Sequence, residues 1–358
     1  MDSSYLQAKL TLIMELHQQG QHHVVAEHCQ EILQLHPNHT HTLNLLALAT
    51  YHLGNAAYAL TLLDKILIID AHFIPAHMNR GFVLLKTHQL EQALMSYAQV
   101  LLLNPQHIGA LNNQGYLLQE LGNHEQALNS YNQILSIDPK NMDALIDRGT
   151  VFMALKQFEK ALHDYHTVVT QYPDFAPVHW HLGWCYLLLG ELDRGWEEFE
   201  WRFIILESSL PPNTITQPLW SGEQLLINKK ILLWSEQGGF GDTIQFIRYV
   251  KNVAALGAQV YVLTHTPLKP LLENIHGVTR VIIHGEPLPH CDYQCPIISL
   301  PHRFKTNLNS IPADIPYLYS DPYKALLWKE KLNSLIQNYF RPFSVSVRNW
   351  ECFQTQPL

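Results

Sequence analysis

The sequence predicts a chain in two parts, a stack of paired helices followed by a single α/β unit. Three observations support this fold class. Small residues, aromatic residues and prolines recur every 34 residues through the first two-thirds of the 358-residue chain, which indicates a repeat architecture. Prolines between residues 211 and 218 then end the period. Beyond them, short apolar segments typical of strands alternate with helical segments, as in a parallel sheet.

The repeat is carried by columns of residues that stay in phase. They are Pro37, Pro105, Pro139 and Pro173; Gly81, Gly115, Gly149 and Gly183; Ala93, Ala127, Ala161 and Gly195; and Tyr97, Tyr131, Tyr165 and Phe199. This pattern resembles the tetratricopeptide repeat (TPR). We therefore expect residues 1–209 to form a TPR α-solenoid of six units, the last one degenerate. The predicted units are 6–39, 40–73, 74–107, 108–141, 142–175 and 176–209.

Each column has a physical cause. The glycine of the first helix lets the second helix approach closely, and the alanine lies at the same crossing. The aromatic residue is expected to fill the gap between adjacent repeats, and the proline cannot continue a helix. The last unit contains the aromatic-rich segment 195–203, GWEEFEWRF, which we expect to dock onto the part that follows.

The concave face of such a solenoid is lined by the first helix of each pair. Asn79, Asn113 and Asp147 each precede a signature glycine by two residues, so they form a polar row at one repeat spacing. The row resembles the asparagine ladder in the TPR superhelix of O-linked N-acetylglucosamine transferase, which implies a groove that holds a protein or peptide by its backbone. The alternative is that these are ordinary solvated polar residues on an inner face.

The last third of the chain has a different organisation. Residues 210–222 are predicted to be a linker, and residues 223–340 a Rossmann-like α/β half. Its expected strands are 229–237, 258–264, 278–285 and 292–301. The helical candidates 242–257 and 267–275 lie between them. Ligands of parallel sheets gather beyond the carboxyl ends of the strands, so the segment after residue 237 is the first place to look for a site.

Several segments of this part resemble bacterial TPR-containing glycosyltransferases. They are PLWSGE, KKILLWSEQGGFGDTIQFIRYV, LGAQVYVL, SLPHRF and IPADIPYL, within 218–328. That family is similar to the heptosyltransferases and to O-linked N-acetylglucosamine transferase. The resemblance implies that the α/β part is the N-terminal lobe of a two-lobed GT-B fold, whose donor is a nucleotide sugar.

The loop after the first expected strand holds the candidate site residues. Glycines at Gly238, Gly239 and Gly241 would let backbone N–H groups approach an anion or a sugar. Glu236 and Gln237, at the end of the strand, would orient either the loop or an acceptor. The resemblance to heptosyltransferases implies that Asp242 is the general base of a transfer reaction. Asp242 and the residues after it also fit a helix capping box.

Arg248 lies further along the same helical segment. It either meets a phosphate or supports the packing of the helix.

The resemblance ends near residue 328, and residues 341–358 do not match the family pattern. A donor-binding second lobe would need about 150 residues. We therefore expect a catalytic domain truncated near residue 340, by a natural deletion or a frameshift, that lacks its donor half.

Composition excludes several other classes of protein. The net charge is −8 and no basic run is present, so a nucleic-acid partner is not expected. No apolar stretch is long enough to span a bilayer, and five scattered cysteines favour reduced thiols in a cytoplasmic protein. The 22 histidines lack ligand partners at metal spacing. Neither a metal nor a cofactor is expected.

Three functions remain open from the sequence. The first is a TPR scaffold that binds protein and carries an incomplete glycosyltransferase-like domain. The second is a glycosyltransferase acting on a protein or glycan, which could take a nucleotide sugar only if a separate chain completes it. The third is a nonfunctional remnant.

Overall fold

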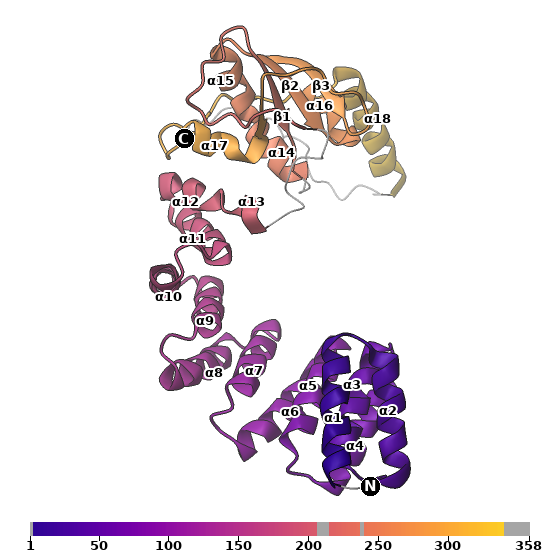
Figure 1. The fold of residues 1–358 in the computed structure, drawn as a ribbon. Coiled ribbons are helices and arrows are strands. Elements are labelled where there is room, and N and C mark those ends of the chain that lie inside the picture. The colour runs from indigo at the N-terminus through magenta and orange to yellow at the C-terminus, as the bar shows by residue number, and fades with distance from the viewer. Residues whose placement is uncertain (1–2, 206–214, 237–239, 340–358) are drawn as a thin grey trace. The chain divides into compact units, whose positions relative to one another are not determined.

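The computed structural model describes residues 3–205, 215–236 and 240–339. The chain forms two compact units, Met1–Leu189 and Gly190–Leu358 (Figure 1). The predicted non-matching tail, 341–358, lies outside the described residues.

The first unit is built of consecutive helices joined by short turns. They are α1 (Ser3–Gln18), α2 (His22–Leu35), α3 (Thr40–His52), α4 (Ala56–Ile69), α5 (Ile74–Lys86), α6 (Leu90–Leu103), α7 (Ile108–Glu120), α8 (His124–Ile137), α9 (Met142–Ala154), α10 (Phe158–Gln171) and α11 (Ala176–Leu189). The predicted unit starts at residues 40, 74, 108, 142 and 176 coincide with the first residues of α3, α5, α7, α9 and α11. The period of 34 therefore places the helix pairs correctly.

Close packing inside each repeat explains the glycine and tyrosine columns. A Cβ atom added to Gly81 or Gly115 would lie 2.7 Å from the ring of the tyrosine sixteen residues later, and one added to Gly149 would lie 2.4 Å from it. All three tyrosine side chains are fully buried. Only glycine leaves room for the ring. Tyr97 also packs with Leu117 and Tyr165 with Leu182, each in the following repeat, so these tyrosines fill the space between adjacent repeats, as expected.

The turn inside each pair requires a left-handed residue. Gly20, Gly54 and Gly122 adopt φ of 74°, 88° and 76°, and His88 and Lys156 take the equivalent positions with φ of 58°. A residue with a Cβ atom is strained in this region by about 1–2 kcal/mol. The packing of the flanking helices therefore dictates the turn even where the sequence does not supply glycine.

Two arginines tie neighbouring repeats together. On α5, Arg80 donates through Nε to Asp64 of α4 at 2.8 Å and through Nη1 to Ser96 of α6 at 2.9 Å. On α9, Arg148 reaches α8 through Nη1 and forms a two-pronged ion pair with Asp164 of α10 at 2.7 and 2.8 Å. Each guanidinium thus bridges the second helix of one repeat to that of the next.

The second unit begins with helices that the sequence assigned to the sixth repeat. These are α12 (Leu192–Phe199) and α13 (Arg202–Ile205), and they are followed by a small α/β structure. Its elements are β1 (Lys230–Trp234), α14 (Phe240–Phe246), η2 (Ile247–Tyr249), α15 (Val250–Ala255), β2 (Gln259–Thr264), η3 (Thr266–Leu268), α16 (Lys269–Leu272), β3 (Val278–Ile283), β4 (Tyr293–Pro296), η4 (Ile297–Ser299), α17 (Leu300–Arg303) and α18 (Pro322–Tyr339).

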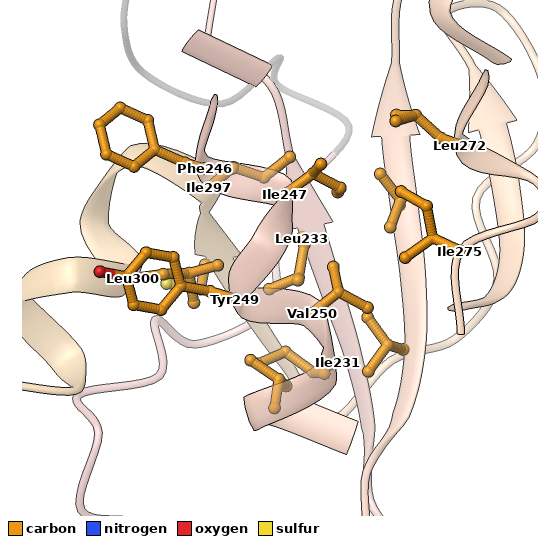
Figure 2. Packing of buried hydrophobic residues seen from close by; sticks show 14 of the residues in the cluster. Ile231, Leu233, Phe246, Ile247, Tyr249, Val250, Leu272, Ile275, Ile297 and Leu300 are labelled. Carbon is orange, nitrogen blue, oxygen red and sulfur yellow. The ribbon is translucent and has the colours of Figure 1, made fainter. Parts of the chain in front are cut away.

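The four strands form a parallel sheet in the order β3-β2-β1-β4. Both faces of the sheet are covered. Ile231 and Leu233 of β1 pack under α14 and α15 (Figure 2), whereas Leu232 and Trp234 belong to a second cluster on the other face. Burial on both faces is the usual reason that parallel strands are apolar throughout.

The sheet differs from its sequence-based prediction at two places. The fourth strand ends at Pro296, and the expected remainder forms η4 and α17, because the strand turns into helix at Ile297. Within the predicted linker, Leu219 forms a parallel bridge with Gln294, and the Trp220 side chain is 1% exposed. These residues belong to the edge of the sheet. None of the helices that the structure describes is both long and apolar enough to cross a membrane.

Candidate functional site

The polar row of the first unit lies on consecutive first helices. Asn79, Asn113 and Asp147 occupy equivalent positions on α5, α7 and α9, and all three are half-buried. Asn79 donates through Nδ2 to Asn44 Oδ1 of α3 at 2.8 Å. The row therefore starts with an amide pair that joins two neighbouring first helices.

Each following member of the row lies against the tyrosine of the preceding repeat. Asn113 lies near the Tyr97 hydroxyl, which is buried without a hydrogen-bond partner, and burial raises the pKa of Tyr97 to about 12. Asp147 lies near Tyr131 and Tyr165, and burial followed by the Asp147 charge raises the pKa of Tyr131. The tyrosines that pack on the repeat glycines thus also support the row.

Sequence reasoning missed a fourth member of the row. His181 precedes Gly183 by the same two residues, and its ring stacks on Tyr165 with centroids 5.3 Å apart and planes 19° apart. Burial lowers the pKa of His181, which favours the neutral imidazole. The signal was present in the sequence, because the offset from the glycine column continues into the last repeat.

Asp147 is the acidic member of the row, and its carboxylate lacks a counter-charge in the part of the chain that the structure describes. Within the described residues its carboxylate has no hydrogen-bond or ion-pair partner, and the neighbouring guanidinium of Arg148 is engaged by Asp164. Burial, followed by repulsion from Asp143, raises the pKa of Asp147 to about 6. The Tyr131 hydroxyl nearby is also buried without a partner.

The second place where a ligand could bind is the carboxyl edge of the parallel sheet. The chain leaves β1 towards β2 on one side and returns to β4 on the other, so the topological switch point lies between the ends of β1 and β4. Open parallel sheets bind their ligands in the crevice outside this point. Here Glu236 follows β1 directly, and Ser299 follows β4 within η4.

The side chain of Arg202 from α13 fills this position and is 1% exposed. Its Nη2 donates to Glu236 Oε1 at 2.6 Å and to Ser299 Oγ at 2.7 Å. Its Nη1 donates to Glu200 Oε1 at 2.7 Å, and Glu200 also pairs with Arg303. Two arginines and two glutamates therefore form a closed network in which each charge has a partner.

Aromatic residues hold the same segment in place. The Arg202 guanidinium lies 4.2 Å from the centroid of the Phe203 ring. Trp196 of α12 contacts Phe246 of α14 edge-on, with ring centroids 5.5 Å apart. The prediction that the aromatic-rich segment docks onto the following part is confirmed for Trp196. Glu200 and Arg202 were not identified from the sequence as members of a charged network. Their position among aromatic residues is the feature of the sequence that indicates burial.

The predicted loop residues are only partly described. Gln237, Gly238 and Gly239 lie outside the described residues, and Gly241 and Asp242 are exposed in the first turn of α14. Because α14 already includes Phe240, Asp242 lies inside the helix and the capping-box alternative is wrong.

The Arg248 guanidinium is used for packing. Its Nη2 donates to the Tyr317 hydroxyl at 3.2 Å, its Nη1 to the Pro312 carbonyl at 3.4 Å and its Nε to the Gln245 carbonyl at 2.8 Å. The guanidinium also lies 4.6 Å from the centroid of the Tyr317 ring. Of the two roles that the sequence allowed, support of the packing is the one these contacts fit.

A cluster of histidines lies where α1, α2 and α3 meet. The ring of His22 stacks on His52 with centroids 4.4 Å apart and contacts His17 at 5.1 Å. Burial and then repulsion from neighbouring imidazoles lower the pKa values of His17 and His22. Across the described part of the chain, no group of three or more histidine, cysteine, aspartate or glutamate side chains has the geometry to hold a metal ion.

Comparisons with known proteins agree with the repeat architecture. Residues 73–140 and 146–199 match family models described as tetratricopeptide repeat. Protein FlbA of Caulobacter vibrioides is 26% identical over 180 residues, which are 45% of this chain and 30% of FlbA. The chain thus spans less than a third of that curated relative. Residues 73–199 therefore include tetratricopeptide repeats.

Solved structures share the fold at low sequence identity. A tetratricopeptide repeat protein from Parabacteroides merdae superposes with a TM-score of 0.51 at 18% identity, covering 70% of this chain and 90% of its own. PilF of Pseudomonas aeruginosa superposes with a TM-score of 0.51 at 14% identity, covering 57% of this chain and 92% of its own. Both are similar to this chain in fold alone.

Proposed function

We propose that the chain is a protein-binding scaffold whose TPR unit holds an extended peptide segment along the polar row. The observation that carries the proposal is the repeated placement of half-buried Asn79, Asn113, Asp147 and His181 on successive first helices. Amide side chains can donate to and accept from a peptide backbone at the same time. Asn79 is held by its pair with Asn44, and Asn113 lies beside the buried Tyr97, so both side chains lose little further conformational entropy when a peptide binds.

The α/β unit has a supporting role in this proposal. The switch-point crevice, where a small ligand of a parallel sheet would normally bind, is filled by the Arg202 side chain and its partners. Opening it would leave buried charges without partners, at a cost of several kcal/mol. In this conformation the α/β unit therefore serves as a structural domain, and the Arg202 side chain takes the space in the crevice that a ligand would need.

A glycosyltransferase is the second candidate function. It is favoured by the strand order β3-β2-β1-β4, which matches the first four strands of doubly wound nucleotide-binding sheets. The exposed carboxylate of Asp242 at the carboxyl edge fits the proposed role of a general base. In this reading a separate chain supplies the donor-binding lobe, and Asp242→Asn removes transfer activity in the completed assembly.

Peptide binding by the row is tested by titrating fluorescent peptides into the full chain. Each peptide has about ten alanine, serine and glycine residues, and the peptides differ in the residue at the central position. The double variant Asn79→Ala with Asn113→Ala is expected to weaken all the peptides by about tenfold, because each lost amide removes a backbone hydrogen bond. Gln133→Ala deletes an exposed amide on the second helix α8 and serves as the matched control. Unchanged affinity in the double variant, or no binding of any peptide to the parent chain, would contradict the proposal.

A further inference from the structure

The Asp147 carboxylate is the member of the polar row that needs a partner from outside the chain. It is half-buried, and within the described residues no cation reaches it, since Arg148 on the same helix pairs with Asp164 at 2.7 Å. A partly buried carboxylate without a counter-charge or hydrogen bonds is costly to keep. The other members of the row avoid this cost because Asn79 and Asn113 are neutral amides and burial lowers the pKa of His181.

Two further groups beside Asp147 favour a cation. Asp143 lies one helical turn earlier on α9 and repels the Asp147 charge. The Tyr131 side chain is fully buried, and its hydroxyl near Asp147 has no hydrogen-bond partner. The hydroxyl therefore adds an oxygen, and no positive charge, to the surroundings of Asp147.

The charge of the whole unit points the same way. Residues 1–189 contain 8 lysines and arginines against 15 aspartates and glutamates, a net charge of −7, whereas residues 190–358 contain 15 against 16, a net charge of −1. Almost the entire net charge of the chain therefore lies on the repeat unit. A field of this sign attracts basic partners and raises their rate of association.

We propose that the peptide segment bound by the row carries a lysine or arginine whose cation pairs with Asp147 beside Tyr131 and Asp143. This inference rests on the proposed function and names the chemistry of its partner. Asn79 and Asn113 would fix the peptide backbone, and Asp147 would select the side chain.

The test compares fluorescent peptides that differ only in the central residue: lysine, arginine, glutamate or norleucine, which has the carbon chain of lysine without its ammonium group. The parent chain is expected to bind the lysine and arginine peptides on the order of tenfold more tightly than the norleucine peptide. The preference should fall in high salt because the pair is partly exposed.

Asp147→Asn should reduce the preference for lysine over norleucine to less than about twofold. Glu125→Gln makes the same change of charge at an exposed position of the second helix α8 and should leave the preference intact. Equal binding of all four peptides, or a lysine preference that survives in Asp147→Asn, would overturn this inference and leave the scaffold proposal standing. Failure of every peptide to bind would overturn both.

Discussion

Asp147→Asn is expected to make the repeat unit more stable at neutral pH, although most substitutions of partly buried residues destabilise a protein. The substitution keeps the shape of the side chain and removes its charge. In the folded chain that charge is half-buried, has no partner within the described residues and is repelled by Asp143. Asparagine therefore relieves a cost that aspartate imposes.

The size of the gain follows from the pKa of Asp147, which rises from its usual value of 3.8 to about 6 in the folded chain. Each pKa unit corresponds to about 1.4 kcal/mol, so the shift sets an upper limit of about 3 kcal/mol. Solvent screens a side chain that remains partly exposed, and we expect a gain of about 1–1.5 kcal/mol in the free energy of unfolding.

The raised pKa of Asp147 determines how the free energy of unfolding changes with pH. The folded chain holds the Asp147 proton more tightly than the unfolded chain does, so this stabilisation is complete below the unfolded pKa of 3.8 and is lost as the pH rises through about 6. The advantage of Asp147→Asn is therefore largest above pH 6 and small near pH 4.

Urea unfolding followed by far-ultraviolet circular dichroism, at about pH 7.5 and about pH 4.5, measures this difference. Glu27→Gln, at an exposed position in the middle of α2, controls for the change of net charge and should have little effect at either pH. A loss of stability in Asp147→Asn at pH 7.5, or an equal gain at both pH values, would refute the reasoning.

Three further outcomes are expected. Gly115→Ala should lower the free energy of unfolding by about 1–3 kcal/mol, because its Cβ would lie 2.7 Å from the Tyr131 ring, whereas Gly241→Ala enters open space and should be nearly neutral in the same urea experiment. Arg202→Met should cost about 3–5 kcal/mol by leaving Glu236 buried and unpaired, and adding Glu236→Gln should recover part of that loss; additive losses would contradict the network. Burial and repulsion lower the pKa of His22, so stability is lost as the pH falls below about 6.5. His22→Gln should weaken this acid sensitivity in hydrogen exchange of α1 and α2, and an unchanged acid profile would exclude the mechanism.

The repeat unit was predictable because each constraint is local and recurs. Gly115 and Tyr131 meet within one repeat, so the same spacing had to appear in every copy, and the period then gave the helix starts. The row follows from the same offset, which His181 continues two residues before Gly183. Contacts that span the sequence left no such signal: Arg202 and Ser299 are 97 residues apart.

In the α/β unit, the sequence predicts the strands but not the pairing at the edge of the sheet. The alternation of apolar segments predicted parallel strands, but residues 219–220 were placed in the linker although Trp220 N donates to the Gln294 carbonyl at 2.8 Å. A single backbone pairing at a sheet edge has no periodicity to reveal it. The capping-box prediction for Asp242 failed for a related reason, since a sequence motif does not say where the preceding turn begins.

The charged groups around Arg202 and around Asp147 differ in whether they are paired inside the chain. Around Arg202, each of the four charged groups has an opposite charge beside it inside the chain, so the network stabilises the docking of α13. Around Asp147 the balance is incomplete, with a second carboxylate and an unpartnered hydroxyl nearby. A chain selected for stability alone would have an amide or a counter-charge at this position. The retained cost is the physical reason to assign recognition to Asp147 and support to Arg202.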